Sequence, residues 1–280
     1  ADEIQVSAST TGLLRSTLPP EDYAAWRAEW SQALARQPAP TAQQKQQFAA
    51  TMQKLTEPGA EDKLYRQLQP QLAAFRAHHA QDLPMLVGIM QAAGNNVVQN
   101  AAEMSASQKQ QATEAIAALA AWAQTADFTD PARAKQAIGV VCATARKLDI
   151  KTLDQLRALD YPATMARYAA GWDGLKQLLK IYGLDLDASF DSAKVETLGD
   201  DGTHARVRET FVLAGKPIVS EVNLVKEQGH WYDADRLAAW RKRHAAAAAP
   251  GKSPNAALTP AVPHSVPTIA PAAPASAGHH

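Results

Sequence analysis

Glu209 and Ser220 are the two residues whose type and position most favour chemistry in this chain. Each lies in a segment in which apolar and polar residues alternate, at a place that the alternation assigns to the apolar face of a β-sheet. A carboxylate on such a face costs on the order of several kcal/mol unless it is paired or hydrated. Two interpretations follow: a pocket between the sheet and a helix, or a position near the sheet edge from which Glu209 reaches solvent. The second is favoured.

A pocket on this face needs a covering helix, and residues 161–182 supply the nearest one in the sequence. Their apolar side chains recur at steps of three and four, which predicts one stripe on an amphipathic helix. Tyr168 and Trp172 lie on that stripe, and Trp231 lies in the last strand of the predicted sheet. We therefore expect these three aromatic residues, together with the two polar ones, to line the ligand pocket if it forms.

A run of oxygen-bearing side chains matches the ligand positions of an EF-hand calcium loop. The matching residues are Asp185, Asp187, Ser189, Asp191 and Glu196. Phe190 stands where the loop needs a glycine for its turn, and a strand rather than a second helix is predicted after the last ligand. The sequence therefore favours a solvated connector, with a calcium site as the alternative.

Other catalytic and cofactor motifs are not recognisable. The chain has no zinc-ligand spacing, no Gly-x-Ser-x-Gly elbow and no glycine-rich phosphate loop. We therefore predict no catalytic residue and no cofactor. The single cysteine, Cys142, excludes an internal disulfide framework, and its apolar neighbours favour a small buried thiol.

Four short segments after Gly183 alternate with period two and predict an antiparallel β-meander. The predicted strands are residues 195–198, 205–213, 218–225 and 230–232, separated by glycine-containing turns. A turn centred between Gly215 and Lys216 predicts the register of the central hairpin. The predicted pairs are Leu213 with Ile218, Phe211 with Ser220, Glu209 with Val222, and Val207 with Leu224.

A helix followed by a short meander that ends in Gly229-His230-Trp231-Tyr232 resembles the final part of the cone-shaped α+β domains typified by nuclear transport factor two. It also resembles small meander domains of bacterial envelope proteins. The resemblance covers residues 161–235, about a quarter of the chain. It implies a helix packed on a small sheet and no particular catalytic residue, because that superfamily contains enzymes and non-enzymes.

Residues 19–160 have the three- and four-residue periodicity of a helical domain. Residues 41–47 and 105–111 are similar, and in each a hydroxyl residue precedes a glutamine by three positions, which predicts a capping box at a helix start. A duplicated helical hairpin, residues 41–80 and 105–147, would explain the similarity. Chance similarity between glutamine-rich helix starts explains it equally well.

Residues 83–98 form the most hydrophobic stretch of the chain. The stretch is shorter than the roughly 20 residues that a bilayer-spanning helix needs, and amide side chains such as Gln91 and Asn95 interrupt it. We predict a buried central helix with close contacts at Gly88 and Gly94, and no stable membrane span. A membrane-inserting hairpin is the alternative.

Charge and composition narrow the classes of partner. Twenty-eight basic residues balance 28 acidic ones, so no global field attracts nucleic acid or an anionic membrane. The start, Ala1-Asp2-Glu3, resembles the mature end left by signal-peptide cleavage and predicts a periplasmic or secreted protein. Residues 1–18 are expected to be a flexible arm, and the Ala/Pro-rich residues 249–280 a disordered tail.

Together these patterns predict an α+β fold that is predominantly α. A multi-helix bundle is followed, within residues 161–248, by a helix, a meander of three to four strands and a final helix. We expect a non-enzymatic binding protein whose partner is a protein or a small apolar ligand; the oligomeric state stays open. An enzyme with its site around Glu209 is one alternative, and a membrane-perturbing factor acting through residues 83–98 is the other.

Overall fold

The computed structural model describes residues 18–78, 82–101 and 104–248. The chain divides into two compact units, residues 1–241 and 242–280. The first unit holds the elements discussed below as far as residue 241, and the described residues of the second, 242–248, are the helical end of the last element. The predicted disordered tail, and the predicted flexible arm except for Leu18, lie outside the described residues.

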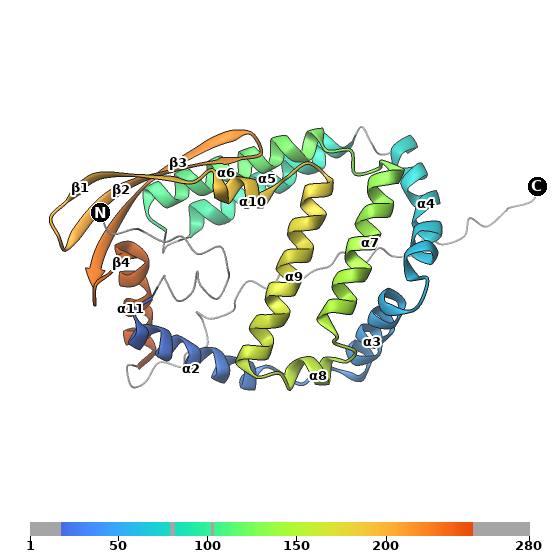
Figure 1. The fold of residues 1–280 in the computed structure, drawn as a ribbon, viewed down its shortest axis with the longest axis horizontal. Coiled ribbons are helices and arrows are strands. Elements are labelled where there is room, and N and C mark those ends of the chain that lie inside the picture. The colour runs from blue at the N-terminus through green and yellow to red at the C-terminus, as the bar shows by residue number, and fades with distance from the viewer. Residues whose placement is uncertain (1–17, 79–81, 102–103, 249–280) are drawn as a thin grey trace, which may run out of the picture. The chain divides into compact units, whose positions relative to one another are not determined.

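The predicted fold class is confirmed: the described residues form ten helices and four strands, and helix predominates. The helices are α2 (Pro20–Arg36), α3 (Ala42–Thr56), α4 (Ala60–His78), α5 (Leu83–Asn100), α6 (Ala106–Thr125), α7 (Pro131–Leu148), α8 (Leu153–Arg157), α9 (Tyr161–Ile181), α10 (Leu186–Asp191) and α11 (Ala234–Ala248). The strands are β1 (Lys194–Asp200), β2 (His204–Leu213), β3 (Lys216–Glu227) and β4 (His230–Asp233). Figure 1 shows their order along the chain.

The two predicted capping boxes are confirmed. The Thr41 side chain accepts a hydrogen bond from the Gln44 backbone N–H, and the Gln44 side chain accepts one from the Thr41 N–H at 2.9 Å. Ser105 and Gln108 repeat both bonds at the start of α6. The two helices have different partners: α3 packs on α4, α7 and α8, whereas α6 packs on α5 and the sheet.

Helix α7 packs against α4 on one side and α9 on the other (Figure 1). The α7–α9 contact is close at Gly174, where an added Cβ would lie 2.2 Å from Thr144 Oγ1. On the other side, the Arg146 guanidinium donates two hydrogen bonds to Glu61 of α4 and lowers the pKa of that carboxyl to about 2. Helix α7 is thus held by backbone proximity on one side and by an ion pair on the other.

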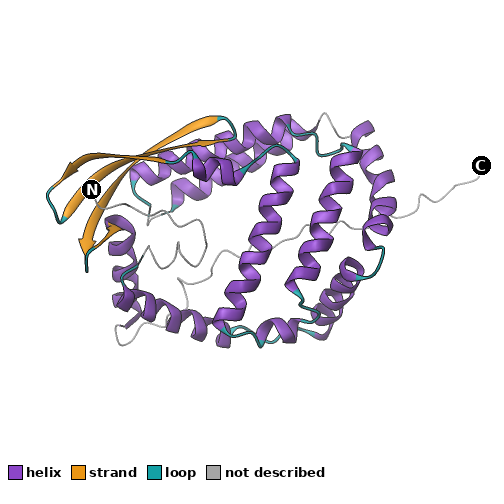
Figure 2. Ribbon diagram, in the orientation of Figure 1, coloured by secondary structure: helices purple, strands orange, loops and turns teal. Residues whose placement is uncertain are grey.

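The four strands form an antiparallel meander in the order β1-β2-β3-β4 (Figure 2). The β2–β3 turn consists of Ala214 and Gly215, which both have positive φ (51° and 78°), as a two-residue type I′ hairpin requires. The predicted register placed this turn one residue too late and was therefore wrong by two residues. The observed pairs are Leu213 with Lys216, Phe211 with Ile218, Glu209 with Ser220, and Val207 with Val222. A shift of two preserves the faces, because side chains alternate with period two.

The helix that covers the sheet is α6 rather than the predicted helix of residues 161–182. The cluster beneath it contains Ala118 of α6 with Leu213 and Ile218 of the sheet, and Leu184 from the segment after α9. Alanines on α6 let its backbone approach the strands closely. Helix α9 uses its small-residue side on α7 instead, and Leu179 near its end reaches the sheet cluster.

A second cluster lies between α11, β4 and α2. Tyr232, Leu237 and Trp240 are buried there, with Leu18 and Trp26 packed against them. Arg241 donates hydrogen bonds to both Asp22 and Glu227, and these two carboxylates hold its pKa above the ordinary value for arginine. The hydrogen bonds of Arg241 to these two carboxylates therefore join α2, β3 and α11.

The prediction that residues 83–98 form a buried central helix is wrong. Helix α5 packs on α6 along one side, where Gly94 lies against Ile116, but Val87 is its one buried residue. Space around Gly88 is open, so the predicted close contact there is absent. Among the described residues, no helix combines the length and apolarity that a membrane crossing requires.

Candidate functional site

Glu209 and Ser220, the predicted polar pair, are direct cross-strand neighbours. Ser220 is buried, and its Oγ has no hydrogen-bond partner among the described residues. Glu209 is half-buried. Burial raises the pKa of its carboxyl, the charge of Arg236 opposes that rise and the charge of Asp233 adds to it. The sequence placed both residues on one face but not in contact, because the predicted register was offset.

The three aromatic candidates do not gather around this pair. Trp231 lies in β4, where the Lys226 ammonium sits 5.4 Å from its ring centroid. Tyr168 and Trp172 lie on α9, whose packing partner is α7, and the Tyr168 side chain is half exposed. The predicted pocket between residues 161–182 and the sheet therefore lacks its covering helix.

The five residues of the calcium-loop pattern do not converge. Asp185 caps the short helix α10, and Ser189 donates its hydroxyl hydrogen to the Asp185 carbonyl. The carboxylates are neutralised separately: Asp185 pairs with Lys180, Asp187 with Lys176, and Glu196 with Arg208 across the sheet, while Asp191 is exposed. Within the described part of the chain, no group of three or more His, Cys, Asp or Glu residues could hold a metal ion. Within the pattern, Leu186–Asp191 form the short helix α10, an element that the sequence analysis did not predict.

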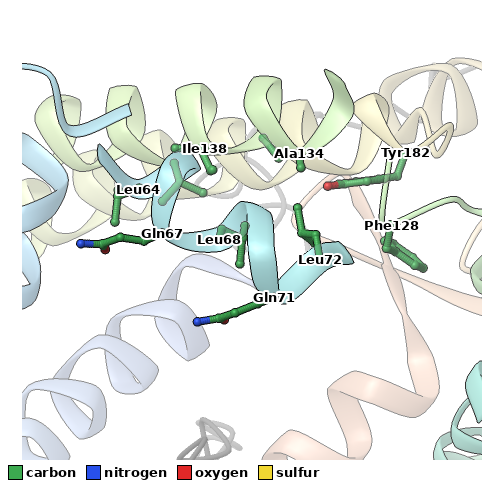
Figure 3. A pocket seen from close by; sticks show the side chains of 11 residues that line it. Leu64, Gln67, Leu68, Gln71, Leu72, Phe128, Ala134, Ile138 and Tyr182 are labelled. Atoms are coloured by element: carbon green, nitrogen blue, oxygen red, sulfur yellow. The ribbon is translucent and has the colours of Figure 1, made fainter. Parts of the chain in front are cut away.

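A groove between α4 and α7 is the candidate site that the structure reveals (Figure 3). Its volume is about 380 Å³. The lining residues are Leu64, Gln67, Leu68, Gln71 and Leu72 of α4, Ala134, Ala137, Ile138 and Val141 of α7, and Phe128 and Tyr182 at one end. None of these described lining residues is charged, so the groove offers an apolar ligand a neutral surface.

The groove follows from the side-chain sizes on its two helices. Leu64, Leu68 and Leu72 recur at four-residue steps and form one apolar ridge on α4. The facing side of α7 begins with the small residues Ala134 and Ala137, which are buried yet fill little space. A large ridge facing small residues leaves a hollow that two matched rows of leucine would have filled.

Aromatic side chains close one end of the groove. The Phe128 and Tyr182 rings are 5.0 Å apart between centroids, and the Trp122 ring meets Phe128 edge-on at 5.7 Å. The Trp122 Nε1–H donates a hydrogen bond of 2.9 Å to the Tyr182 carbonyl. These contacts fix the end of α9 against the loop after α6, and they make a rigid wall.

Tyr182 supplies a polar group at the groove. Figure 3 shows its hydroxyl directed toward the other lining residues, whereas the amides of Gln67 and Gln71 extend away from them. Burial raises the pKa of the Tyr182 hydroxyl, so it stays protonated at neutral pH and can donate a hydrogen bond. The groove thus combines apolar walls with a hydroxyl group that can donate a hydrogen bond.

Sequence reasoning missed this groove. The leucine spacing on α4 was visible, but it predicts only an apolar face and not the element opposite. Comparison with known proteins adds no assignment, because no family model, no curated protein and no solved structure matches the chain. The resemblance of residues 161–235 to transport-factor-like domains therefore stays an expectation from the sequence.

Proposed function

We propose that this protein is a non-enzymatic binding protein that holds a small, uncharged, apolar ligand in the α4–α7 groove. The observation that carries the proposal is a neutral lining with the Tyr182 hydroxyl directed into it. Ligand sites in proteins are typically concave and mostly apolar, with a few polar groups that fix orientation. A periplasmic or secreted location stays a prediction, and the groove assignment does not depend on it.

Burial of apolar surface supplies the affinity in this proposal. Each Å² removed from water contributes about 25 cal/mol, so a ligand that fills the groove gains several kcal/mol before its ordering cost. The Tyr182 hydroxyl selects among apolar ligands, since one carbonyl, ether or hydroxyl group on the ligand can pair with it. A carboxylate or ammonium group finds no opposite charge on the lining and is disfavoured.

The groove can be tested with N-phenyl-1-naphthylamine, a neutral probe whose fluorescence rises in apolar surroundings. We expect saturable binding to the full chain and an at least tenfold weaker Kd for Leu68→Arg, because the cation lies in the apolar lining. The matched control is Leu156→Arg, which changes a partly exposed leucine on α8 and leaves the probe affinity unchanged. Circular dichroism verifies that both variants keep the wild-type helix content.

Equal probe affinities of Leu68→Arg and Leu156→Arg would contradict the assignment of the ligand site to the groove. Failure of the wild-type protein to bind the probe would contradict it as well. Tyr182→Phe refines the assignment: it keeps the ring wall and removes the hydroxyl. Tyr182→Phe should change the Kd little for hydrocarbon probes and raise it more for probes that carry a carbonyl group.

An enzyme with its site at Glu209 is the second candidate function. It is supported by the raised pKa of the Glu209 carboxyl, which favours a proton-transfer group. The buried Ser220 hydroxyl beside it, which has no hydrogen-bond partner in the described part of the chain, supports it further. Loss of a hydrolytic activity in Glu209→Gln, without loss of stability, would establish this function in place of binding alone.

A further inference from the structure

Helix α5 carries an apolar patch that its partner α6 leaves uncovered. The patch is defined by five large side chains that are 45–74% exposed: Met85, Leu86, Ile89, Met90 and Val97. Their spacing places them on one side of the helix, with Ala93 in the middle, and this side is turned away from the side on which Val87 is buried and Gly94 lies against Ile116. Contiguous exposed apolar patches are uncommon on monomeric proteins, and large ones mark interaction sites.

We infer that this patch binds the same patch on a second copy of the chain, and that the two α5 helices pack antiparallel about a two-fold axis near Ala93. The inference is independent of the α4–α7 groove, because α5 contributes no residue to that site.

Charge favours a second copy as the occupant. No charged residue occurs between Leu83 and Asn100. A two-fold axis sets a surface against itself, so any charge close to the axis would meet its own copy, and the patch avoids that repulsion. Helices that lie on anionic membranes carry Lys or Arg on their polar face; α5 carries none, and Asp82 precedes it.

The distribution of side-chain size favours the antiparallel direction. The first half of the exposed side holds Leu86, Ile89 and Met90, whereas the second half holds Asn96 and Val97. Antiparallel pairing about Ala93 places the large half of each helix on the smaller half of the other, so both halves can interdigitate. Parallel pairing would oppose large residues to large ones and leave the smaller halves apart.

The size of the contact sets its strength. Two helices of this length meet over about 27 Å. One helix from each copy supplies the whole contact, whereas a standard stable interface buries roughly 800 Å² per partner. The dimer is therefore reversible, and it is populated at micromolar to high micromolar concentrations rather than permanently.

Sedimentation velocity of the full chain across that concentration range tests the inference. We expect a monomer–dimer equilibrium for the wild type and at least a tenfold weaker association for Ile89→Glu. The control Leu175→Glu places the same charge at a partly exposed leucine on α9 and leaves association unchanged. A wild-type protein that stays monomeric at every concentration overturns the inference, and so does equal dimerisation of both variants.

A cysteine scan tests the direction of pairing. Ala93→Cys lies beside the two-fold axis and should form a disulfide-linked dimer under mild oxidation, whereas Ala143→Cys on the exposed side of α7 should not. The native Cys142 is fully buried and does not compete. Cross-linking of both variants alike indicates random collision and contradicts the two-fold contact. Binding of neutral phosphatidylcholine vesicles by the monomer, lost in Ile89→Glu, would replace the second copy with a bilayer.

Discussion

The β-meander and the helical region differ in how far along the chain their contacts reach. Each strand of the meander pairs with the next one through a short turn, so neighbours in the sequence are neighbours in the sheet. Helix α7, in contrast, packs on α3, α4 and α9, and α5 and α6 lie between α4 and α7 in the chain. Local sequence patterns are therefore enough to predict the strand order of the sheet. They are not enough to predict which helices pack together.

The two regions also differ in what a small residue does. In the meander, Ala214 and Gly215 make a turn, and their positive φ is a local backbone requirement. In the helical region, Gly174 allows a close approach to Thr144 on another helix, which depends on a partner some 30 residues away. The same residue type is thus a local signal in one region and a long-range contact in the other.

The largest expected effect comes from the covered face of the meander. Ile218→Ala removes a side chain that is 1% exposed, and we expect it to lower the free energy of unfolding by about 2–5 kcal/mol. The neighbouring Val219→Ala, on the solvent face, should cost less than about 0.5 kcal/mol. Urea denaturation measures both. Similar losses for the two variants would mean that the faces of β3 are assigned wrongly.

A smaller effect is expected at the α7–α9 contact. In Gly174→Ala the new Cβ overlaps Thr144, which should cost about 1–3 kcal/mol of stability. Gly171→Ala, one turn earlier and with open space at its Cβ, should instead stabilise α9 by about 0.5–1 kcal/mol. Thermal unfolding of the two variants gives opposite shifts in Tm if α9 packs as described, and adding Thr144→Ala to Gly174→Ala should restore part of the loss.

The smallest effect is expected at Glu209, and it depends on pH. Burial raises the pKa of this carboxyl above its ordinary 4.5, so the folded protein holds the proton more tightly than the unfolded chain. Stability is then full below the unfolded pKa and falls as the pH rises through the raised folded value. Glu209→Gln should therefore stabilise the protein near neutral pH and have little effect at acidic pH.

The control for Glu209 is Glu196→Gln, which changes an exposed carboxylate on β1. Urea midpoints across the acidic-to-neutral range compare the two variants. If Glu209→Gln instead destabilises the protein at neutral pH, the carboxylate has a favourable partner when ionised, and the buried-acid description of this position is incorrect.

The residue types in the sequence predicted the polar pair on the covered face of the sheet. Alternation in β2 and β3 located Glu209 and Ser220 on one covered face, and the structure makes them neighbours. Their contact was missed because the hairpin turn is Ala214-Gly215, and alanine is an unusual residue for a left-handed position. The α4–α7 groove could not be predicted, because its hollow arises only when the Leu68 ridge meets the small Ala134 and Ala137.

Helix α5 is a second case in which the sequence did not predict the tertiary contacts. Its high hydrophobicity indicated burial, yet Met85 and Met90 are among the most exposed large apolar residues of the described chain. The hydrophobicity of a segment indicates how unfavourable its contact with water is. It does not indicate which other surface will shield the segment from water. Burial within the chain and burial against a second copy carry the same sequence signature.

The sequence by itself determined the described helices apart from the short α10, the two capping boxes, the four strands and the covered face of the β2–β3 hairpin. Those features depend on residues within a few positions of one another, where backbone geometry and side-chain period leave few choices. The tertiary structure alone decided that α6 covers the sheet, that α4 and α7 enclose the groove, and that α5 stays uncovered. These outcomes depend on how side-chain volumes fit between segments far apart in the chain, and period and composition do not encode that fit.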